Sequence, residues 1–561
     1  MHRSCGCRRK SWAGWAVALC AVGSAVLLRV PRANAGVAND PAIAAASCGR
    51  MAAVRIDHLV ITTARWVATG PLPARDLRML PMMPMMHMLA HLPLPAHCLI
   101  RGVLEPRVGV GGVRYGLRFE LRLPARWNGR FLFQGGAGLD GFVAPALGLL
   151  TPGYPPALAR GFAVISSDGG HEGLSAAFAE DQQARLDYAY AGLGPVARLG
   201  RKLIRLYYGR AARDSYFAGC SNGGREAMMV AERFPTLFNG IVAGDPGFNL
   251  ARAAIAEMWS VRHLQAIAPR DSRGRPILSE ALTPQDLQWV SRAVLRECDA
   301  LDGLRDGMIN NSAACRKHFN PAVLLCRHGA RRACLSKPKL KALQAVFAGP
   351  HNSSGKPLYA SWPYDAGVDT SGWRMWKLGT SRTGVPNALD ATLGVDAMRY
   401  YFMTPPSPRM TPETFNFNRA LRRTAQTRAL NDATGTFFSS FIAHGGKLII
   451  YQGLSDPVFS ANAVTAWYRR LMSQYHQPQK WVRLFLIPGM NHCGGGPSTD
   501  EFDALTAIVR WTEKDRAPAR IVAHGPAFPG VKRPLCPFPE YARYRGGNPR
   551  SAGSFVCAKG S

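Results

Sequence analysis

Acidic residues are scarce in this sequence. The 561 residues include 36 aspartates and glutamates against 69 lysines and arginines, which gives a formal net charge of +33 at pH 7. The basic residues are scattered along the chain, and no recognisable nucleic-acid-binding motif accompanies them. Because nucleic-acid binders gather their basic residues on one surface, we expect no nucleic-acid partner. Composition bias, or affinity for acidic surfaces and substrates, accounts better for the charge.

The sequence has no internal repeat and, after residue 35, no apolar run long enough to cross a bilayer. The start of the chain differs. An apolar stretch at residues 11–28 follows a basic segment with Arg8 and Arg9, and it precedes an A-x-A pattern at residues 33–35. This layout predicts a secretory signal peptide over residues 1–35, with a retained membrane anchor as the alternative. We therefore expect a secreted or periplasmic protein with no membrane span after signal removal.

Cysteines are few, but their number is even once the signal peptide is set aside. Three of the thirteen cysteines lie before residue 36. An even number in an exported chain predicts a disulfide framework rather than reduced core thiols. The ten that remain are Cys48, Cys98, Cys220, Cys298, Cys315, Cys326, Cys334, Cys493, Cys536 and Cys557.

A serine between two glycines is the first chemical signal. In "DSYFAGCSNGGREAMMVAERFP", Ser221 stands in the spacing G-x-S-x-G between a short apolar run and a run of helix formers. A strand, a tight turn and a helix in that order place a serine hydroxyl at the top of the turn, where it can act as a nucleophile. Alone, the motif also fits an ordinary glycine loop.

An acid and a histidine follow in the chain order that a serine hydrolase of this kind needs. Asp456 comes after the apolar run "KLIIY", and His492 comes after "RLFLI". Parallel strands carry their sites at their carboxyl ends, so we expect both side chains at the same sheet edge as Ser221. A histidine there takes the serine proton, and a carboxylate orients the imidazole.

The cysteines beside the serine and the histidine suggest a pair. Cys220 precedes Ser221, and Cys493 follows His492. A bond between the two cysteines would tie the nucleophile loop to the base loop, and we predict that bond. Two unrelated structural cysteines are the alternative.

The quoted segments resemble the tannase and feruloyl esterase family of α/β-hydrolases. The likeness runs from about Cys48 to Cys557 and is carried by "GCSNGGREAMM", "GGKLIIYQGLSDPVFS", "PGMNHCGGGPSTDEFD" and "RPLCPFPEYARY". The resemblance implies an α/β-hydrolase fold with a large inserted lid domain. We predict a catalytic domain at residues 36–250 and 432–561, with the lid at residues 251–431.

The resemblance also implies an oxyanion hole and a substrate contact. One donor would be the backbone N–H of Asn222, and the other would come from the glycine loop of "WNGRFLFQGGAGLDG", with Gly136 favoured over Gly135. Small residues let amides approach a developing negative charge. Phe459 matches a substrate-contacting aromatic residue, and Trp373 and Trp376 are candidates for the wall of the site or for the core.

A metal site is expected in the lid. Asp299, Asp302 and Asp306 lie on one short turning loop, "ECDALDGLRDGMIN", and such oxygen ligands suit Ca²⁺. The resemblance adds backbone oxygens of Leu304 and Met308 and implies a structural ion; a solvated acidic turn is the alternative. We pair Cys298 with Cys315 and Cys326 with Cys334, and the resemblance implies Cys48–Cys98 and Cys536–Cys557.

Taken together, the residues and the resemblance predict a secreted serine carboxylesterase. It would hydrolyse small-molecule esters of aromatic (phenolic) acids through an acyl-enzyme, without an organic cofactor. Alternatives are a terephthalate-monoester hydrolase, in which Arg382 or Arg399 would hold the free carboxylate, a peptidase or lipase, a basic surface-binding module, and an inactive calcium-stabilised binding protein. The Met-rich stretch at residues 79–88 reads as an irregular apolar loop or, less simply, as a Cu(I) site.

Overall fold

The structure is a computed structural model that describes residues 41–73, 76, 92–326 and 333–560. The predicted signal peptide at residues 1–35 and the Met-rich stretch at residues 79–88 lie outside these ranges. Within them, no helix combines the length and the apolar character that crossing a bilayer requires.

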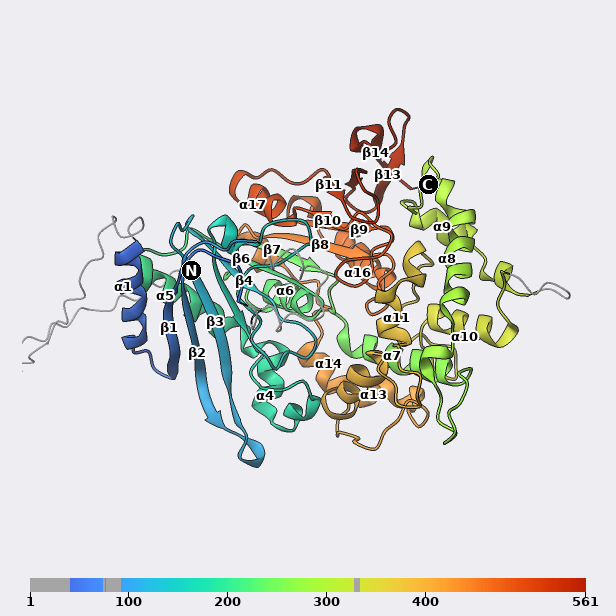
Figure 1. The fold of residues 1–561 in the computed structure, drawn as a ribbon, viewed down its shortest axis with the longest axis horizontal. Helices are drawn as coiled ribbons and strands as arrows, with labels where there is room; N and C mark the ends of the chain where they lie inside the picture. The colour runs from blue at the N-terminus through green and yellow to red at the C-terminus, as the bar shows by residue number, and fades with distance from the viewer. Residues whose placement is uncertain (1–40, 74–75, 77–91, 327–332, 561) are drawn as a thin grey trace, which may run out of the picture.

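A nine-stranded sheet runs through the molecule in the order β1-β2-β3-β5-β4-β6-β7-β8-β9 (Figure 1). The first strands pair antiparallel, from β1 to β5, whereas β5, β4 and β6 to β9 are all parallel. The parallel part brings the carboxyl ends of β6, β8 and β9 to one edge. The strands are Leu59–Val67, His97–Val108, Arg114–Pro124, Arg130–Gln134, Ala163–Ser167, Asp214–Cys220, Gly240–Gly244, Lys447–Gly453 and Val482–Ile487, numbered β1 to β9.

Helices cover both faces of this sheet because its central strands are apolar on both sides. In β4, Phe131 and Phe133 pack into one core cluster, whereas Leu132 between them packs into another. The first cluster includes α1 (Pro41–Arg50), α5 (Leu193–Tyr208), α6 (Asn222–Arg233) and α16 (Ala461–Gln474). The second includes α17 (Ala504–Lys514). This is the layering of an α/β fold with a buried parallel sheet.

A long, mostly helical segment joins β7 to β8. It has a core of its own, built from α7 to α11 and lying at the end of the molecule opposite α1 (Figure 1). The backbone N–H of Ala433 donates to Phe248 O (2.8 Å), so the chain leaves the sheet and returns to it at neighbouring positions. The division at residues 250 and 432 stays a prediction. The helices are Leu250–Gln265, Pro284–Cys298, Ser312–His318, Lys337–Ala348, Ser371–Lys377, Val395–Ala397, Ala420–Arg423, Ala425–Asn431 and Ser439–Ala443, numbered α7 to α15.

Smaller elements complete the chain. A short helix, α4 (Gln182–Leu186), precedes α5. After β9 come a three-stranded sheet and a two-stranded sheet, formed by β10 (Glu501–Phe502), β11 (Ile521–His524), β12 (Arg533–Leu535), β13 (Glu540–Tyr544) and β14 (Phe555–Lys559). The disulfides have the expected pairing, namely Cys48–Cys98, Cys220–Cys493, Cys298–Cys315, Cys326–Cys334 and Cys536–Cys557.

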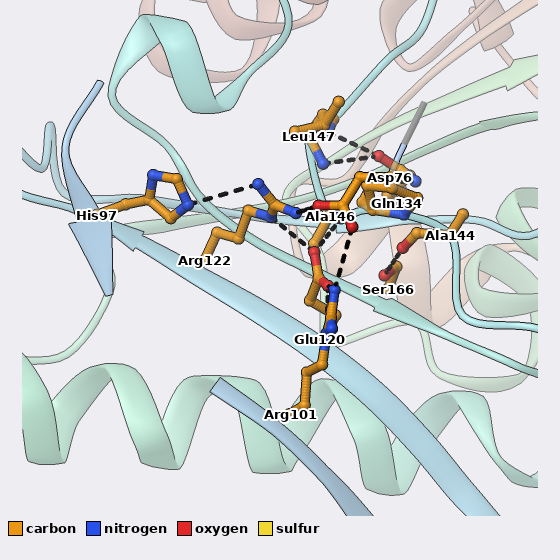
Figure 2. A network of polar contacts seen from close by, with 12 residues as sticks. Asp76, His97, Arg101, Glu120, Arg122, Gln134, Ala144, Ala146, Leu147 and Ser166 are labelled. Atoms are coloured by element: carbon orange, nitrogen blue, oxygen red, sulfur yellow. Dashed lines mark hydrogen bonds and ion pairs between the residues drawn. The ribbon is translucent and has the colours of Figure 1, made fainter. Parts of the chain in front are cut away.

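A buried polar network lies under the loop that follows β4 (Figure 2). Arg122 donates to Glu120 Oε1 (2.6 Å) and to Asp76 Oδ2 (2.8 Å). Glu120 Oε1 also accepts from Ala146 N (3.0 Å), and Gln134 Oε1 accepts from backbone amides of residues 147–149. Because buried polar groups must be paired, these side chains fix residues 146–149, just beyond the glycine loop.

We expect Arg122→Met to lower the free energy of unfolding by about 3 kcal/mol, because it removes a buried cation from two buried carboxylates. Arg213→Met is the control: the Arg213 side chain is 59% exposed in its ion pair, so its loss should cost less than about 1 kcal/mol. Denaturant unfolding of the two variants measures the difference. Equal effects would contradict a structural role for the buried network.

Candidate active site

Ser221 lies on a tight turn between β6 and α6. Its backbone is in an unusual region for a residue with a side chain (φ 65°, ψ −122°). Its N–H donates to Gly244 O (3.0 Å), and its carbonyl accepts from Arg225 N and Gly247 N. Strand, strained turn and helix are the setting in which a serine hydroxyl is held exposed above a sheet.

The glycines of the motif are required by close backbone packing. A Cβ on Gly219 would lie 2.7 Å from Gly223 Cα, and a Cβ on Gly223 would lie 2.8 Å from Gly136 O. Real Cβ atoms do not approach other atoms so closely. The motif therefore lets the start of α6 pack directly against the end of β4, which any larger residue would prevent.

The structure brings Ser221, His492 and Asp456 together from three strand ends. His492 Nε2 lies 2.8 Å from Ser221 Oγ, and His492 Nδ1 lies 2.9 Å from Asp456 Oδ2. The other oxygen of Asp456 accepts from Val458 N (2.7 Å) and Phe459 N (3.1 Å). This is the hydrogen-bond order of a nucleophile, a base and an orienting acid.

Two neighbouring carboxyl groups act on the pKa of His492. Burial pulls the pKa of His492 down, but the charge and hydrogen bond of Asp456, together with the charge of Asp245, outweigh burial, so the net shift is upward. An imidazole whose pKa is raised is a stronger base toward the Ser221 hydroxyl.

Of the two predicted oxyanion donors, Asn222 and Gly136, only Asn222 has a free backbone N–H. Asn222 is the first residue of α6, so its N–H has no partner within the helix and lies next to Ser221. Gly136 does not supply the predicted second donor, because its N–H donates to the buried carboxylate of Glu226 (2.8 Å). The N–H of Gly135 is likewise taken, by Ala218 O (2.9 Å). The glycine pair instead supports the start of α6.

Two buried carboxyl groups beneath Asn222 were not predicted from the sequence. The Asn222 side-chain amide donates to Asp140 Oδ1 (2.6 Å) and Glu226 Oε1 (3.3 Å). Burial, and then the charge of Glu226, raises the pKa of Asp140 well above its usual range. Arg225 holds the other end of the amide, through Nε to Asn222 Oδ1 (2.7 Å). Only the four-residue spacing of Asn222 and Glu226 on a helix hinted at this contact.

Side chains of the inserted segment hold the loops after β8 and β9. Asp365 Oδ2 accepts from Ser455 Oγ (2.7 Å) and Gly489 N (2.7 Å). Asn491 donates to Gly367 O (3.1 Å) and accepts from the hydroxyl of Thr370. The insertion therefore helps to place the neighbours of Asp456 and His492.

Two aromatic side chains flank the imidazole edge-on. The ring centroids of Phe459 and Trp376 lie 5.3 and 5.4 Å from that of His492. Trp373, the other candidate, packs in the core of the insertion. Of the two arginines considered for a free carboxylate, Arg399 donates to Met410 O (2.6 Å) and Arg382 is exposed.

The acidic loop of the inserted segment has the oxygen donors that Ca²⁺ prefers, but its carboxylates turn toward its own backbone. Asp299 accepts from Asp306 N and Gly307 N (both 3.1 Å), and Asp302 accepts from Leu304 N (3.1 Å). Asp306 accepts from Arg533 and from Met308 N. In the part of the chain that the structure describes, the clusters of three His, Cys, Asp or Glu side chains with ligand atoms within 4.8 Å of one another do not include these aspartates.

Comparisons with known proteins show which family the chain resembles. The family model "Tannase and feruloyl esterase" matches residues 107–558. A mono(2-hydroxyethyl) terephthalate hydrolase from Piscinibacter sakaiensis is 39% identical over 514 residues, covering 83% of this chain and 85% of the relative. A probable feruloyl esterase B-2 from Aspergillus terreus is 28% identical over 472 residues, covering 79% and 83%.

Solved structures show the same fold. Feruloyl esterase B from Aspergillus oryzae matches with a TM-score of 0.75 at 23% identity, over 92% of this chain and all of the other. The tannin acyl hydrolase of Aspergillus niger matches with a TM-score of 0.67 at 19% identity, over 93% and 95%. The predicted α/β fold is confirmed, and the protein is a carboxylic ester hydrolase. It belongs to the tannase and feruloyl esterase family.

The disulfide between Cys220 and Cys493 joins the residues that neighbour Ser221 and His492. We expect Cys220→Ser/Cys493→Ser to lower kcat roughly 10- to 100-fold, because small misplacements of reacting groups have effects of that order. Cys536→Ser/Cys557→Ser, which breaks the bond between β14 and the segment after β12, should lower Tm while leaving kcat per folded molecule unchanged. Ester turnover and thermal melts of both variants test this. A wild-type kcat without the first disulfide would contradict it.

Proposed function

We propose that this protein is an exported serine esterase in which Ser221 is the nucleophile, His492 the general base and acid, and Asp456 the orienting carboxylate. The observation that carries the proposal is the unbroken chain of hydrogen bonds from Ser221 Oγ through the imidazole to Asp456. The substrate class we propose is small esters of aromatic (phenolic) acids.

Acylation begins when Ser221 Oγ attacks the ester carbonyl and His492 Nε2 takes the hydroxyl proton. Asp456 keeps the imidazole in the tautomer that accepts at Nε2 and stabilises the imidazolium that forms. The imidazolium then gives the proton to the leaving alcohol. The negative charge on the carbonyl oxygen develops next to the free N–H of Asn222, which stabilises it.

Deacylation repeats the sequence with water. His492 takes a proton from water, the hydroxide attacks the acyl carbonyl, and the bond to Ser221 Oγ breaks as the imidazolium returns the proton to that oxygen. Released aromatic acid and regenerated serine complete the cycle. No organic cofactor is needed, because every proton moves between the substrate, water and these three side chains.

Aromatic walls support the choice of substrate. Phe459 and Trp376, which are both buried, have their ring centroids 5.3 and 5.4 Å from that of His492, so they place apolar surface beside the imidazole. The relatives named as feruloyl esterases act, by name, on esters of a phenolic acid.

A terephthalate monoester is the second candidate substrate. It is favoured by the 39% identity to a protein named for hydrolysing such an ester. A cation near the acyl ring would be needed to bind its free carboxylate. The two candidates therefore differ in charge and are separable by experiment.

Export is the remaining part of the proposal. All ten cysteines beyond residue 35 form disulfides, and such bonds persist in oxidising compartments. The predicted signal peptide at residues 1–35 would direct the chain there.

Ser221→Ala should lower kcat for ester hydrolysis roughly 10³-fold or more, because the histidine and the aspartate act only through the serine. The measurement is product analysis on methyl ferulate, methyl gallate, a terephthalate monoester and a neutral benzoate ester, with wild-type enzyme and variant. We expect the wild type to prefer the phenolic esters. Turnover that survives in Ser221→Ala would refute the assignment of the nucleophile. Binding without any turnover by the wild type would favour a binding protein on a hydrolase scaffold.

We also propose a structural Ca²⁺ in the lid, held by Asp299, Asp302 and Asp306 with the carbonyl oxygens of Leu304 and Met308. Support comes from the oxygen-donor set on one short loop next to the Cys298–Cys315 disulfide. A bound ion would offset the mutual repulsion of the three carboxylates and stabilise this part of the insertion.

Removing Ca²⁺ should lower the Tm by several degrees, because an ion present at 100 times its Kd stabilises the folded state by about 2.7 kcal/mol. Thermal melts with excess Ca²⁺ and with EGTA measure the shift. Asp302→Asn should abolish it, whereas Asp271→Asn, in another loop of the insertion, should keep it. No shift in the wild-type protein, or an unchanged shift in Asp302→Asn, would contradict the site.

A further inference from the structure

Asp245 lies in the turn directly after β7. In the sheet, β7 lies between β6, which leads to Ser221, and β8, which leads to Asp456. It is fully buried, and its backbone has a positive φ of 35°. Both features are unfavourable for an aspartate unless its surroundings hold it. The sequence "GDPG" around it reads as an ordinary turn, and none of the proposed catalytic steps uses the residue.

The carboxylate of Asp245 binds the backbones of two other loops. Oδ1 accepts from Gly453 N (2.6 Å), three residues before Asp456. Oδ2 accepts from Cys493 N (2.8 Å), the residue after His492. Hydrogen bonds to an ionisable carboxyl are among the stronger ones in proteins, so one side chain couples the acid loop to the base loop.

The same turn also holds the nucleophile. Gly244 O accepts from Ser221 N (3.0 Å), and Gly247 N donates to Ser221 O (3.1 Å). Oδ2 of Asp245 lies 3.7 Å from Cys220 Sγ. The segment 244–247 therefore contacts all three loops that carry Ser221, Asp456 and His492.

The surroundings of Asp245 are acidic rather than cationic. Ligand atoms of Asp245, Asp456 and His492 lie within 4.8 Å of one another. Burial and the charge of Asp456 raise the pKa of Asp245, while His492 acts in the opposite direction. The carboxylate of Asp456 opposes a charge on Asp245, whereas the two backbone amides favour it.

We propose that Asp245 is a positioning residue of the esterase, which keeps His492 in line with both Ser221 and Asp456 by clamping Gly453 N and Cys493 N. The inference rests on the proposed function. It assigns Asp245 no contact with substrate. Its effect passes through the two amides and therefore bears on the rate of the chemical steps rather than on substrate binding.

Asp245→Asn tests the proposal, because asparagine has nearly the same shape and tolerates positive φ. Its NH₂ group cannot accept from an amide, so one clamp is lost. The concentration of active sites in each protein is measured by titrating Ser221 with a fluorophosphonate. We expect kcat per titrated site to fall roughly 10- to 100-fold in the variant and KM to change less than about threefold. If Asp245→Asn yields no folded protein, Asp245→Ser, which is smaller and can still accept, replaces it with the same expectation.

Asp432→Asn is the control, since Asp432 is partly buried and also accepts from a backbone amide, Ala251 N (3.2 Å), outside the three loops. It should lower Tm but keep kcat per titrated site within about twofold. A double-mutant cycle with Asp456→Asn should be strongly non-additive, because both residues act through His492.

Wild-type kcat per titrated site in Asp245→Asn, or a loss no larger than that of the control, would overturn the positioning role. Failure of the proposed function has a different signature: the fluorophosphonate would not label Ser221 in the wild type, or Ser221→Ala would stay active. If Asp245→Asn keeps the wild-type kcat and Ser221→Ala is inactive, only the positioning role of Asp245 is rejected, and the proposed function stands.

Discussion

The backbone of Ser221 adopts a conformation that costs of order 1–3 kcal/mol for a residue other than glycine, and the neighbouring chain holds it there. Its N–H and carbonyl are both bonded to the turn after β7. Two glycines allow α6 to begin against β4, and the sulfur bond of Cys220 reaches the histidine loop. Without this constraint the hydroxyl would not stand at the carboxyl edge of the sheet, and His492 and Asp456 would have no partner to act on.

The rest of the site is built around that turn from long-range contacts. Asp365 of the insertion binds Ser455 and Gly489, so the inserted segment also fixes the loops that carry Asp456 and His492. Beneath the start of α6, Asp140 and Glu226 hold the side chain of Asn222. The charges of the site are therefore set by burial and by fixed dipoles rather than by solvent, which is the arrangement that stabilises a developing oxyanion.

Much of this arrangement could be predicted from the sequence, because its signals are local. Ser221, Asp456 and His492 each follow an apolar run, and each run is a strand of the parallel sheet. The positions of Cys220 and Cys493 beside Ser221 and His492 suggested their bond, and the family resemblance implied Cys48–Cys98 and Cys536–Cys557. The donor role of Gly136 could not be judged in this way, because the acceptor of its N–H, Glu226, lies 90 positions later.

Asp245 escaped prediction for the same reason, since its partners are 208 and 248 positions away.

The hydrogen bond between Ala433 N and Phe248 O joins the two ends of the inserted segment. Because the two ends meet there, segments between them can lengthen, shorten or be exchanged during evolution without shifting β7 against β8, and the entropic cost of such changes grows only slowly with length. Chains that share the sheet are thus free to diverge in the segment inserted between β7 and β8.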